Sequence, residues 1–233
     1  MGADIALIIG AYLLGSVPHL PLLAKLRHVD LNGDFHQSLW YQGGRVTGIA
    51  GILGEFGKGI IPVLVGKGLG FSLPIVALAG LAAVSGQMWP IFSRFDGEKG
   101  NSVALAMAIA LAPKPALVAL VPIIISLVIR TLPRLLNSIK SSSEGPIIGG
   151  AYSRSLPLGM ATAFLWLPLA SWWLGEPLEI ILGYSALFIL IIIRRLTAGI
   201  RSDLRASRDI RDILIKRLLY DRATTTWRQG PIW

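Results

Sequence analysis

The segment with the residue types best suited to chemistry is a short run of glycine and lysine between two apolar stretches. Residues 86–102 read GQMWPIFSRFDGEKGNS. Gly97 and Gly100 permit backbone conformations that bring N–H groups close to a ligand, and Lys99 adds a point charge suited to phosphate. We call residues 96–100 the GEK loop, and we interpret it as a candidate phosphate-binding loop. A simple turn between two helices is the alternative.

The residues that follow the loop predict the start of a helix. Asn101 or Ser102 is expected to be the N-cap, so that the first turn would point unpaired N–H groups and the positive end of the helix dipole toward an anion. The pattern is not a Walker A loop, because it lacks that motif's glycine spacing and a preceding strand.

A second candidate group consists of polar residues inside apolar stretches. Glu55 and Lys58 are three residues apart, so they share one face of a helix. Ionisable residues inside a membrane helix are costly enough to be functional by default, although an internal ion pair that fastens two helices together is an equal alternative. Ser16, just before Pro18, is a weaker candidate for substrate binding, because a hydroxyl in a helix more often bonds its own backbone.

The composition places these residues in a membrane protein. The 233 residues are 53% hydrophobic and 15% charged, whereas an average soluble domain has roughly 25% charged residues. The chain has no cysteine, and its histidines, His19, His28 and His36, form no close-spaced pair. We therefore expect no metal site and no cofactor.

The expected fold is an all-α integral membrane protein with seven transmembrane helices. Each helix needs about 20 mostly apolar residues, or slightly fewer at the margin. The candidate spans are 3–25, 48–66, 70–92, 102–112, 116–132, 155–174 and 178–196. The fourth and fifth are short, because Pro113 and Pro115 mark either a tight turn between two spans or a kink in one long helix.

The distribution of basic residues favours seven spans over six. With seven, every Lys and Arg except Lys58, Lys67 and Lys114 lies on one side, as the positive-inside rule requires for the cytoplasm. The N-terminus is then outside, the C-terminus is cytoplasmic, and the protein is a multi-pass protein of the cell membrane. Residues 1–197 form the membrane domain on this interpretation.

Residues 198–233 are expected to form a basic, amphipathic, cytoplasmic tail. Apolar residues recur in it at helical spacing among many arginines, which is typical of a helix that lies on an anionic lipid surface. No nucleic-acid partner is expected, because the topology accounts for the positive charge.

Four motifs, in order and at similar spacing, resemble those of one enzyme family. Residues 86–100 resemble G-H-x-[FW]-P-x-F-x-x-F-x-G-G-K-G, with Gln87 in place of His and Glu98 in place of Gly. The other three are GSVP at 15–18 for G-S-I-P, EFGKG at 55–59 for D-x-x-K-G, and RLTAG at 195–199 for R-L-x-x-G. The chain is identified by these motifs as a divergent member of the PlsY-type integral-membrane glycerol-3-phosphate acyltransferases, which use acyl phosphate as donor.

The divergence concerns polar residues. The family's first-loop signature, G-S-G-N-x-G-A-T-N-x-x-R, corresponds here to DLNGDFHQSLWY at 30–41. Its last motif continues with His, Asn and Glu at positions that hold Ile189, Ile192 and Arg201 here. Glu98 also puts a carboxylate beside a loop expected to hold phosphate, where like charges repel.

The resemblance implies transfer of an acyl group from acyl phosphate to glycerol 3-phosphate, giving lysophosphatidate in phospholipid biosynthesis. It implies no metal and no covalent enzyme intermediate. The expected phosphate-binding and substrate-binding residues are Gly97, Lys99, Gly100, Ser102, Arg195, Lys58 and Ser16. Two alternatives stay open: a non-catalytic or changed-substrate relative that binds a phosphorylated lipid or a partner enzyme, and a small transporter, whose expected internal repeat is not visible.

Overall fold

The computed structural model describes residues 1–31, 35–140, 155–206 and 209–220, and the regular elements in these ranges are all helical. The helices are α1 (Gly2–Ser16), α2 (His19–Arg27), α3 (Phe35–Tyr41), α4 (Arg45–Gly68), α5 (Leu73–Met88), the short 3₁₀ helix η1 (Ile91–Ser93), α6 (Asn101–Leu111), α7 (Pro113–Lys140), α8 (Ser155–Trp173), α9 (Leu178–Thr197), α10 (Ile200–Ala206) and α11 (Ile210–Tyr220). The predicted all-α fold is confirmed.

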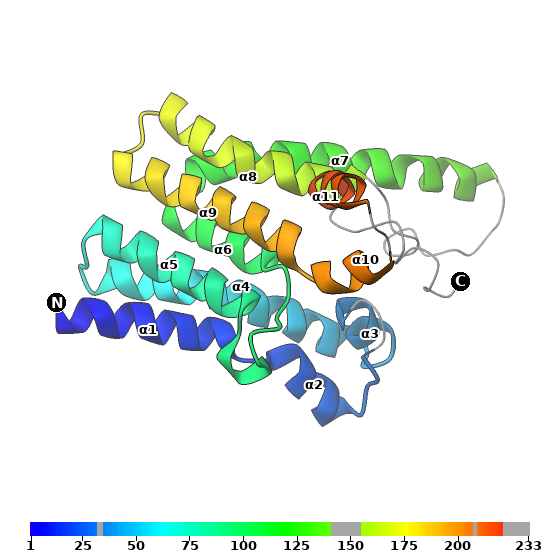
Figure 1. Cartoon of the computed structure of the whole chain (residues 1–233), viewed down its shortest axis with the longest axis horizontal. Coiled ribbons are helices and arrows are strands. Elements are labelled where there is room, and N and C mark those ends of the chain that lie inside the picture. Colours follow the sequence, from blue (N-terminus) through cyan, green and yellow to red (C-terminus); the bar gives the residue numbers. More distant parts are fainter. Residues whose placement is uncertain (32–34, 141–154, 207–208, 221–233) are drawn as a thin grey trace.

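The long helices lie side by side in one bundle (Figure 1). The pairs with the most extensive contacts are α1 with α5, α4 with α6, and α7 with α8, while α9 packs against both α5 and α8. The N-terminus lies at one end of the bundle, and α2, α3 and α10 lie at the other end (Figure 1). The connection between α5 and α6, which contains the GEK loop, is at this second end.

Glycine allows α1 and α5 to approach each other closely. A Cβ atom added to Gly15 would collide with the carbonyl oxygen of Ala83, and one added to Gly86 would collide with the carbonyl oxygen of Tyr12. The Tyr12 hydroxyl donates a 2.7 Å hydrogen bond to the Trp89 carbonyl, just beyond α5. The two helices are therefore held in a fixed register where α1 ends.

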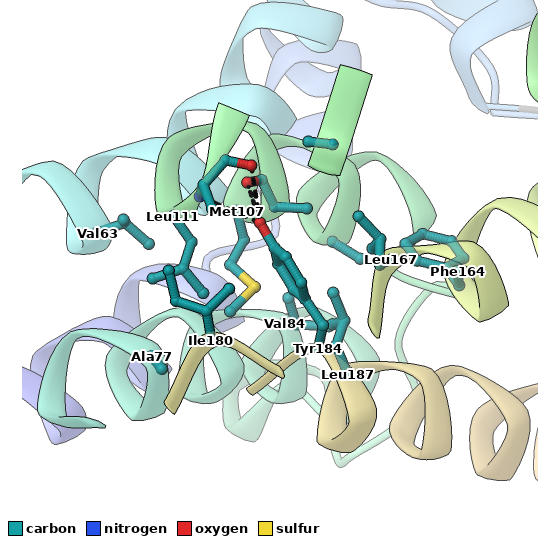
Figure 2. Packing of buried hydrophobic residues seen from close by; sticks show 14 of the residues in the cluster. Val63, Ala77, Val84, Met107, Leu111, Phe164, Leu167, Ile180, Tyr184 and Leu187 are labelled. Carbon is teal, nitrogen blue, oxygen red and sulfur yellow. Dashed lines mark hydrogen bonds between the residues drawn. The ribbon is translucent and has the colours of Figure 1, made fainter. Parts of the chain in front are cut away.

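The buried core joins α4, α5, α6, α7, α8 and α9 (Figure 2). At its centre, the hydroxyl of Tyr184 lies 2.8 Å from the Ala108 carbonyl oxygen and 3.0 Å from that of Ala112. It also accepts a 3.1 Å hydrogen bond from the Ala112 N–H. These bonds tie α9 to the backbone at the end of α6, where the Ala112 N–H also donates to the Ala108 carbonyl at 3.1 Å.

α6 and α7 are separate helices, because α6 ends at Leu111, Ala112 is extended and α7 begins at Pro113. Lys67 supports this break by donating hydrogen bonds of 2.8 Å and 2.7 Å to the carbonyls of Ala110 and Leu111. The single kinked helix is therefore wrong, and the tight turn between two spans stays a prediction.

Five described segments are long and apolar enough to cross a membrane: Gly2–Arg27, Arg45–Gly68, Leu73–Ser93, Pro113–Leu132 and Leu178–Thr197. α6 is apolar but has only 11 residues. α8 has 19 residues and no charged side chain, but it is not among these five. The expected count of seven spans and the orientation in the membrane therefore stay predictions.

Candidate active site

The first site element is the break between α1 and α2. Pro18 has no N–H to donate and follows an extended Val17, so the predicted single helix over 3–25 is in fact two helices. The buried ammonium of Lys58 donates hydrogen bonds of 2.5 Å to the Val17 carbonyl and 2.6 Å to the side-chain oxygen of Gln87. The Ser16 hydroxyl donates to the Tyr12 carbonyl at 2.9 Å.

Glu55 is the centre of a polar cluster beside this break. Its carboxylate is 3% exposed; one oxygen lies 3.1 Å from His36 Nε2, and the other accepts a 3.4 Å hydrogen bond from the Gln87 amide. The side chains of Glu98 and Ser102 are also hydrogen-bonded to Glu55. We call His36, Glu55, Gln87 and Glu98 the Glu55 cluster.

The ionisable side chains of the Glu55 cluster lie close together. Side-chain nitrogen or oxygen atoms of His36, Glu55 and Glu98 all lie within 4.8 Å of one another. Lys58 interacts electrostatically with both carboxyl groups, and a protonated His36 would add a second cation. The charges of the two acids can therefore be balanced by the protein's own side chains.

Glu98 has an altered acidity. Burial, followed by the repulsion from the neighbouring Glu55 carboxylate, raises the pKa of Glu98 to about 8, while His36 and Lys58 act in the opposite direction. Two adjacent carboxyl groups joined by a hydrogen bond hold a proton between them. A carboxyl group with this pKa gains or loses its proton near pH 8.

The GEK loop closes over this cluster and begins α6. Gly100 has a φ of 73° and is the N-cap of the helix. The expectation that Asn101 or Ser102 would be the cap is wrong: the left-handed Gly100 starts the helix one residue earlier, and the Ser102 hydroxyl is engaged with Glu55. Gly97 packs so tightly against the end of α5 that a Cβ would collide with the Gln87 carbonyl.

Arg194, near the end of α9, fastens the loop. Its guanidinium donates to the carbonyls of Gly97 and, at 3.3 Å, Glu98, and it lies 3.7 Å from the Asp96 carboxylate. The guanidinium also stands 5.7 Å from the centre of the Trp89 ring, which adds a cation–π contact. A buried cation is thus placed directly behind the GEK loop.

Arg195 points away from the loop. It is buried and donates to the carbonyl of Leu218 in α11, at 3.0 Å, and to that of Pro157 in α8. The Arg217 guanidinium, which pairs with Asp203, reaches the Arg195 carbonyl at 3.4 Å from the same direction. Arg195 therefore joins the described part of the tail to the bundle.

Two adjoining cavities are formed by these elements. The first, of about 250 Å³, which we call the kink cavity, is lined by Ser16, Val17, Pro18, Lys58 and Gln87 among others. The second, of about 440 Å³, which we call the loop cavity, is lined by Glu55, Lys99, Gly100, Asn101, Ser102 and Arg194 among others. Phe35, Asp96, Gly97 and Glu98 line both cavities.

The structure brings most of the predicted site residues together. Ser16 and Lys58 are in the kink cavity; Lys99, Gly100 and Ser102 are in the loop cavity; Gly97 is in both. Arg195 is in neither, and the neighbouring Arg194 occupies the place expected for it.

Sequence reasoning did not select Arg194, Asn101 or His36 as site residues. Arg194 had no distinguishing signal, since it precedes an arginine that fits the motif. His36 lies in the stretch 30–41, where the resemblance fails and offers no guide. Asn101 was assigned to the helix cap alone.

Comparison with known proteins gives a family for this site. The model of the family "Glycerol-3-phosphate acyltransferase" matches residues 5–202. The chain belongs to this family. A glycerol-3-phosphate acyltransferase of Geobacter metallireducens is 43% identical over 120 residues, which cover 49% of this chain and 62% of that protein.

Two solved structures of the acyltransferase PlsY share the fold. The lysophosphatidic acid form is 28% identical with a TM-score of 0.64, over 88% of this chain and 93% of that one. The glycerol 3-phosphate form is 25% identical with a TM-score of 0.60, over 98% and 100% of the two chains. Both are described as an integral membrane glycerol 3-phosphate acyltransferase.

These findings confirm the predicted PlsY-type family, the location in a membrane and the enzyme class, a membrane acyltransferase of glycerol 3-phosphate in phospholipid synthesis. The acyltransferase model ends at residue 202, within α10. The Glu55 cluster, the GEK loop and Arg194 all lie inside the matched region.

Proposed function

We propose that this chain transfers an acyl group from acyl phosphate to glycerol 3-phosphate at the two adjoining cavities, producing lysophosphatidate and phosphate. The observation that carries the proposal is the lining of the loop cavity, which includes Lys99, Arg194 and the first turn of α6. This is the arrangement of donors and positive charge that a phosphate group needs.

The loop cavity is the proposed phosphate site. The N-terminal turn of α6 supplies backbone N–H groups from the Gly100–Ser102 region, and Arg194 lies behind the loop where it stabilises negative charge. Because phosphate is already a good leaving group, the protein has to hold the reactants in line and stabilise developing charge rather than provide a nucleophile.

The kink cavity is the proposed site of the acyl carbonyl and the start of the acyl chain. Val17, Leu20, Pro21 and Phe35 give it apolar walls, and Lys58 places a cation at its base. A positive charge held in position before the reaction stabilises the negative charge that develops on a carbonyl oxygen.

We further propose the topology with seven spans, the N-terminus outside and the C-terminus in the cytoplasm. Support comes from the arrangement of the bundle, in which the N-terminus lies at the end opposite to α2, α3 and α10 (Figure 1). This puts the two cavities at the cytoplasmic end, where glycerol 3-phosphate is available and where the basic residues gather.

The tail is proposed to contact anionic lipid. Leu204, Ile210 and Ile215 expose apolar side chains on α10 and α11, and Arg205 and Arg211 are exposed beside them. Exposed apolar residues next to arginine favour an anionic lipid surface. Residues 221–233 of the predicted tail lie outside the described residues.

Acyl transfer by the purified protein in lipid tests the proposed function. With palmitoyl phosphate and glycerol 3-phosphate, the wild type should form lysophosphatidate, and Lys99→Ala should abolish most of the turnover because the loop cavity loses its lysine. Lys114→Ala is the matched control, since Lys114 is exposed in the first turn of α7. No turnover by folded wild-type protein, or full turnover by Lys99→Ala, would contradict the proposal.

A further inference from the structure

Three side chains that depart from the family motifs meet at one carboxylate. Gln87 is at the position where the family motif has His, and Glu98 is where that motif has Gly. His36 lies in the stretch that lacks the family's first-loop signature. All three are hydrogen-bonded to Glu55. The departures therefore form one connected network rather than scattered losses.

Glu98 occupies the position between the two cavities. Among the described residues that line both, Phe35 and Gly97 have no ionisable group, and Asp96 is 95% exposed and paired with Arg194. Glu98 is half buried, and its neighbours are the side chains of the Glu55 cluster. A group bound across the two cavities would have this carboxyl group at its reacting centre.

Charged and titratable groups face Glu98 from each surrounding element. Lys58 and Glu55 come from α4, His36 from α3 and Arg194 from α9, and His19 of α2 lines the same kink cavity; Asp96 and Lys99 flank Glu98 in the GEK loop. The cations outnumber the other acids in this set, so an ionised Glu98 has counter-charges available.

We propose that Glu98 is a catalytic base that accepts the proton of the acceptor hydroxyl during acyl transfer. This inference rests on the proposed function. The hydroxyl oxygen forms a bond to the acyl carbon as its O–H bond breaks and the proton passes to the Glu98 carboxylate. The bond between the acyl carbon and the bridging oxygen breaks, and its electron pair leaves with phosphate.

The Glu55 cluster gives the accepted proton a route to solvent. Glu98 is hydrogen-bonded to Glu55, and Glu55 lies 3.1 Å from His36 Nε2. The His36 side chain is 34% exposed, so it can release the proton to water. Gln87 holds the other oxygen of Glu55, which keeps the carboxylate oriented between Glu98 and His36. Glu55, His36 and Gln87 are positioning and relay residues on this scheme.

The acidity of Glu98 suits this role and sets the expected pH dependence. A base is most effective when its pKa is near the working pH, and the pKa of Glu98 is raised to about 8. A carboxyl group accepts a proton only in its ionised form, which is populated above its pKa. Turnover should therefore rise with pH up to about 8 and then level off.

The experiment compares Glu98→Gln with the wild type in the acyl-transfer assay across pH. Glu98→Gln keeps the size and the hydrogen-bonding capacity but cannot accept a proton, so kcat should fall about 100-fold or more with little change in KM. The rise of turnover toward pH 8 should disappear. Glu179→Gln is the matched control, because Glu179 is exposed in the first turn of α9 at the opposite end of the bundle.

A second variant separates catalysis from folding. Glu98→Gly restores the residue of the family motif and opens space beside Glu55, so added formate should recover part of its turnover by supplying a carboxylate. Formate should not stimulate Glu98→Gln, where the space is filled.

The outcomes distinguish this inference from the proposed function. An active wild type with a Glu98→Gln variant of equal kcat and unchanged pH profile would overturn the role of Glu98 and leave the proposed function intact. A wild type without turnover would overturn the proposed function, and the role of Glu98 with it. Loss of turnover in Glu98→Gly that formate does not relieve would also count against a base.

Discussion

Arg194 and Arg195 are adjacent in the sequence and hold different parts of the molecule. Arg194 donates to the backbone of the GEK loop, whereas Arg195 donates to carbonyls of α8 and α11. Neighbouring residues on a helix are separated by about 100°, since one turn has 3.6 residues. One arginine therefore serves the site and the other serves the packing of the tail.

Exchanging each arginine for glutamine should give different defects. Arg194→Gln removes a charged donor from the loop cavity, so KM for glycerol 3-phosphate or acyl phosphate should rise about 10-fold to 100-fold, equivalent to about 1.5–3 kcal/mol. Arg195→Gln should instead lower the unfolding temperature while KM changes little. Steady-state kinetics and thermal unfolding of both variants check this. A rise in KM confined to Arg195→Gln would show that Arg195, and not Arg194, binds substrate.

The arginine that lines the cavity could not be chosen from the sequence. The motif resemblance selected Arg195, because the pattern R-L-x-x-G fits it, and helical periodicity allows either residue to face the loop. The lysine and glycines of the GEK loop could be predicted, because their chemistry and backbone freedom are local properties. The contacts of Glu98 and His36 depend on residues from α4 and α5, which no local pattern specifies.

At the scale of elements, the close approach of α1 and α5 sets the geometry of the site. Gly15 and Gly86 let the two backbones meet just before the break at Val17, whose carbonyl then receives the Lys58 ammonium. A wider separation would move this carbonyl away from Lys58. The geometry of the kink cavity therefore depends on a contact between α1 and α5 whose glycines have no side chain that could bind substrate.

Two alanine substitutions on α1 test this dependence. Gly15→Ala would put a Cβ against the Ala83 carbonyl and should destabilise the protein by about 1–3 kcal/mol, with reduced turnover because the Lys58 contact shifts. Gly10→Ala is the matched control, since a Cβ there meets nothing within 4 Å. Thermal unfolding in detergent measures both, and equal stability of the two variants would show that the helices can separate without loss.

The positions of the helices could be predicted better than their ends. Apolar stretches located α4, α5 and α9 because hydropathy is a sum over many residues. The break at Val17 and the N-cap of α6 at Gly100 were not predicted, since each depends on the backbone conformation of one residue and on side chains from other helices. Lys58 stabilises the break by bonding the Val17 carbonyl. At the start of α6, the Ser102 side chain bonds Glu55 and Gly100 is the cap.

At the scale of the whole molecule, the proposed orientation puts both cavities on the cytoplasmic side. The native chain has no cysteine, so single cysteines can report which side a position faces. Leu69→Cys, in the α4–α5 turn, should react with a membrane-impermeant maleimide in intact cells. Arg205→Cys, on α10, should react only after permeabilisation, and the reverse pattern would invert the topology.

The wall shared by the two cavities has a kinetic consequence. On the proposed scheme, Glu98 lines both cavities and accepts the proton of the acceptor hydroxyl while acyl phosphate is bound, so both substrates must be present before either product leaves. The donor dissolves in the bilayer and the acceptor dissolves in water, and the protein joins them only when both are bound. The substrate in shorter supply therefore sets the rate at which new lipid is made.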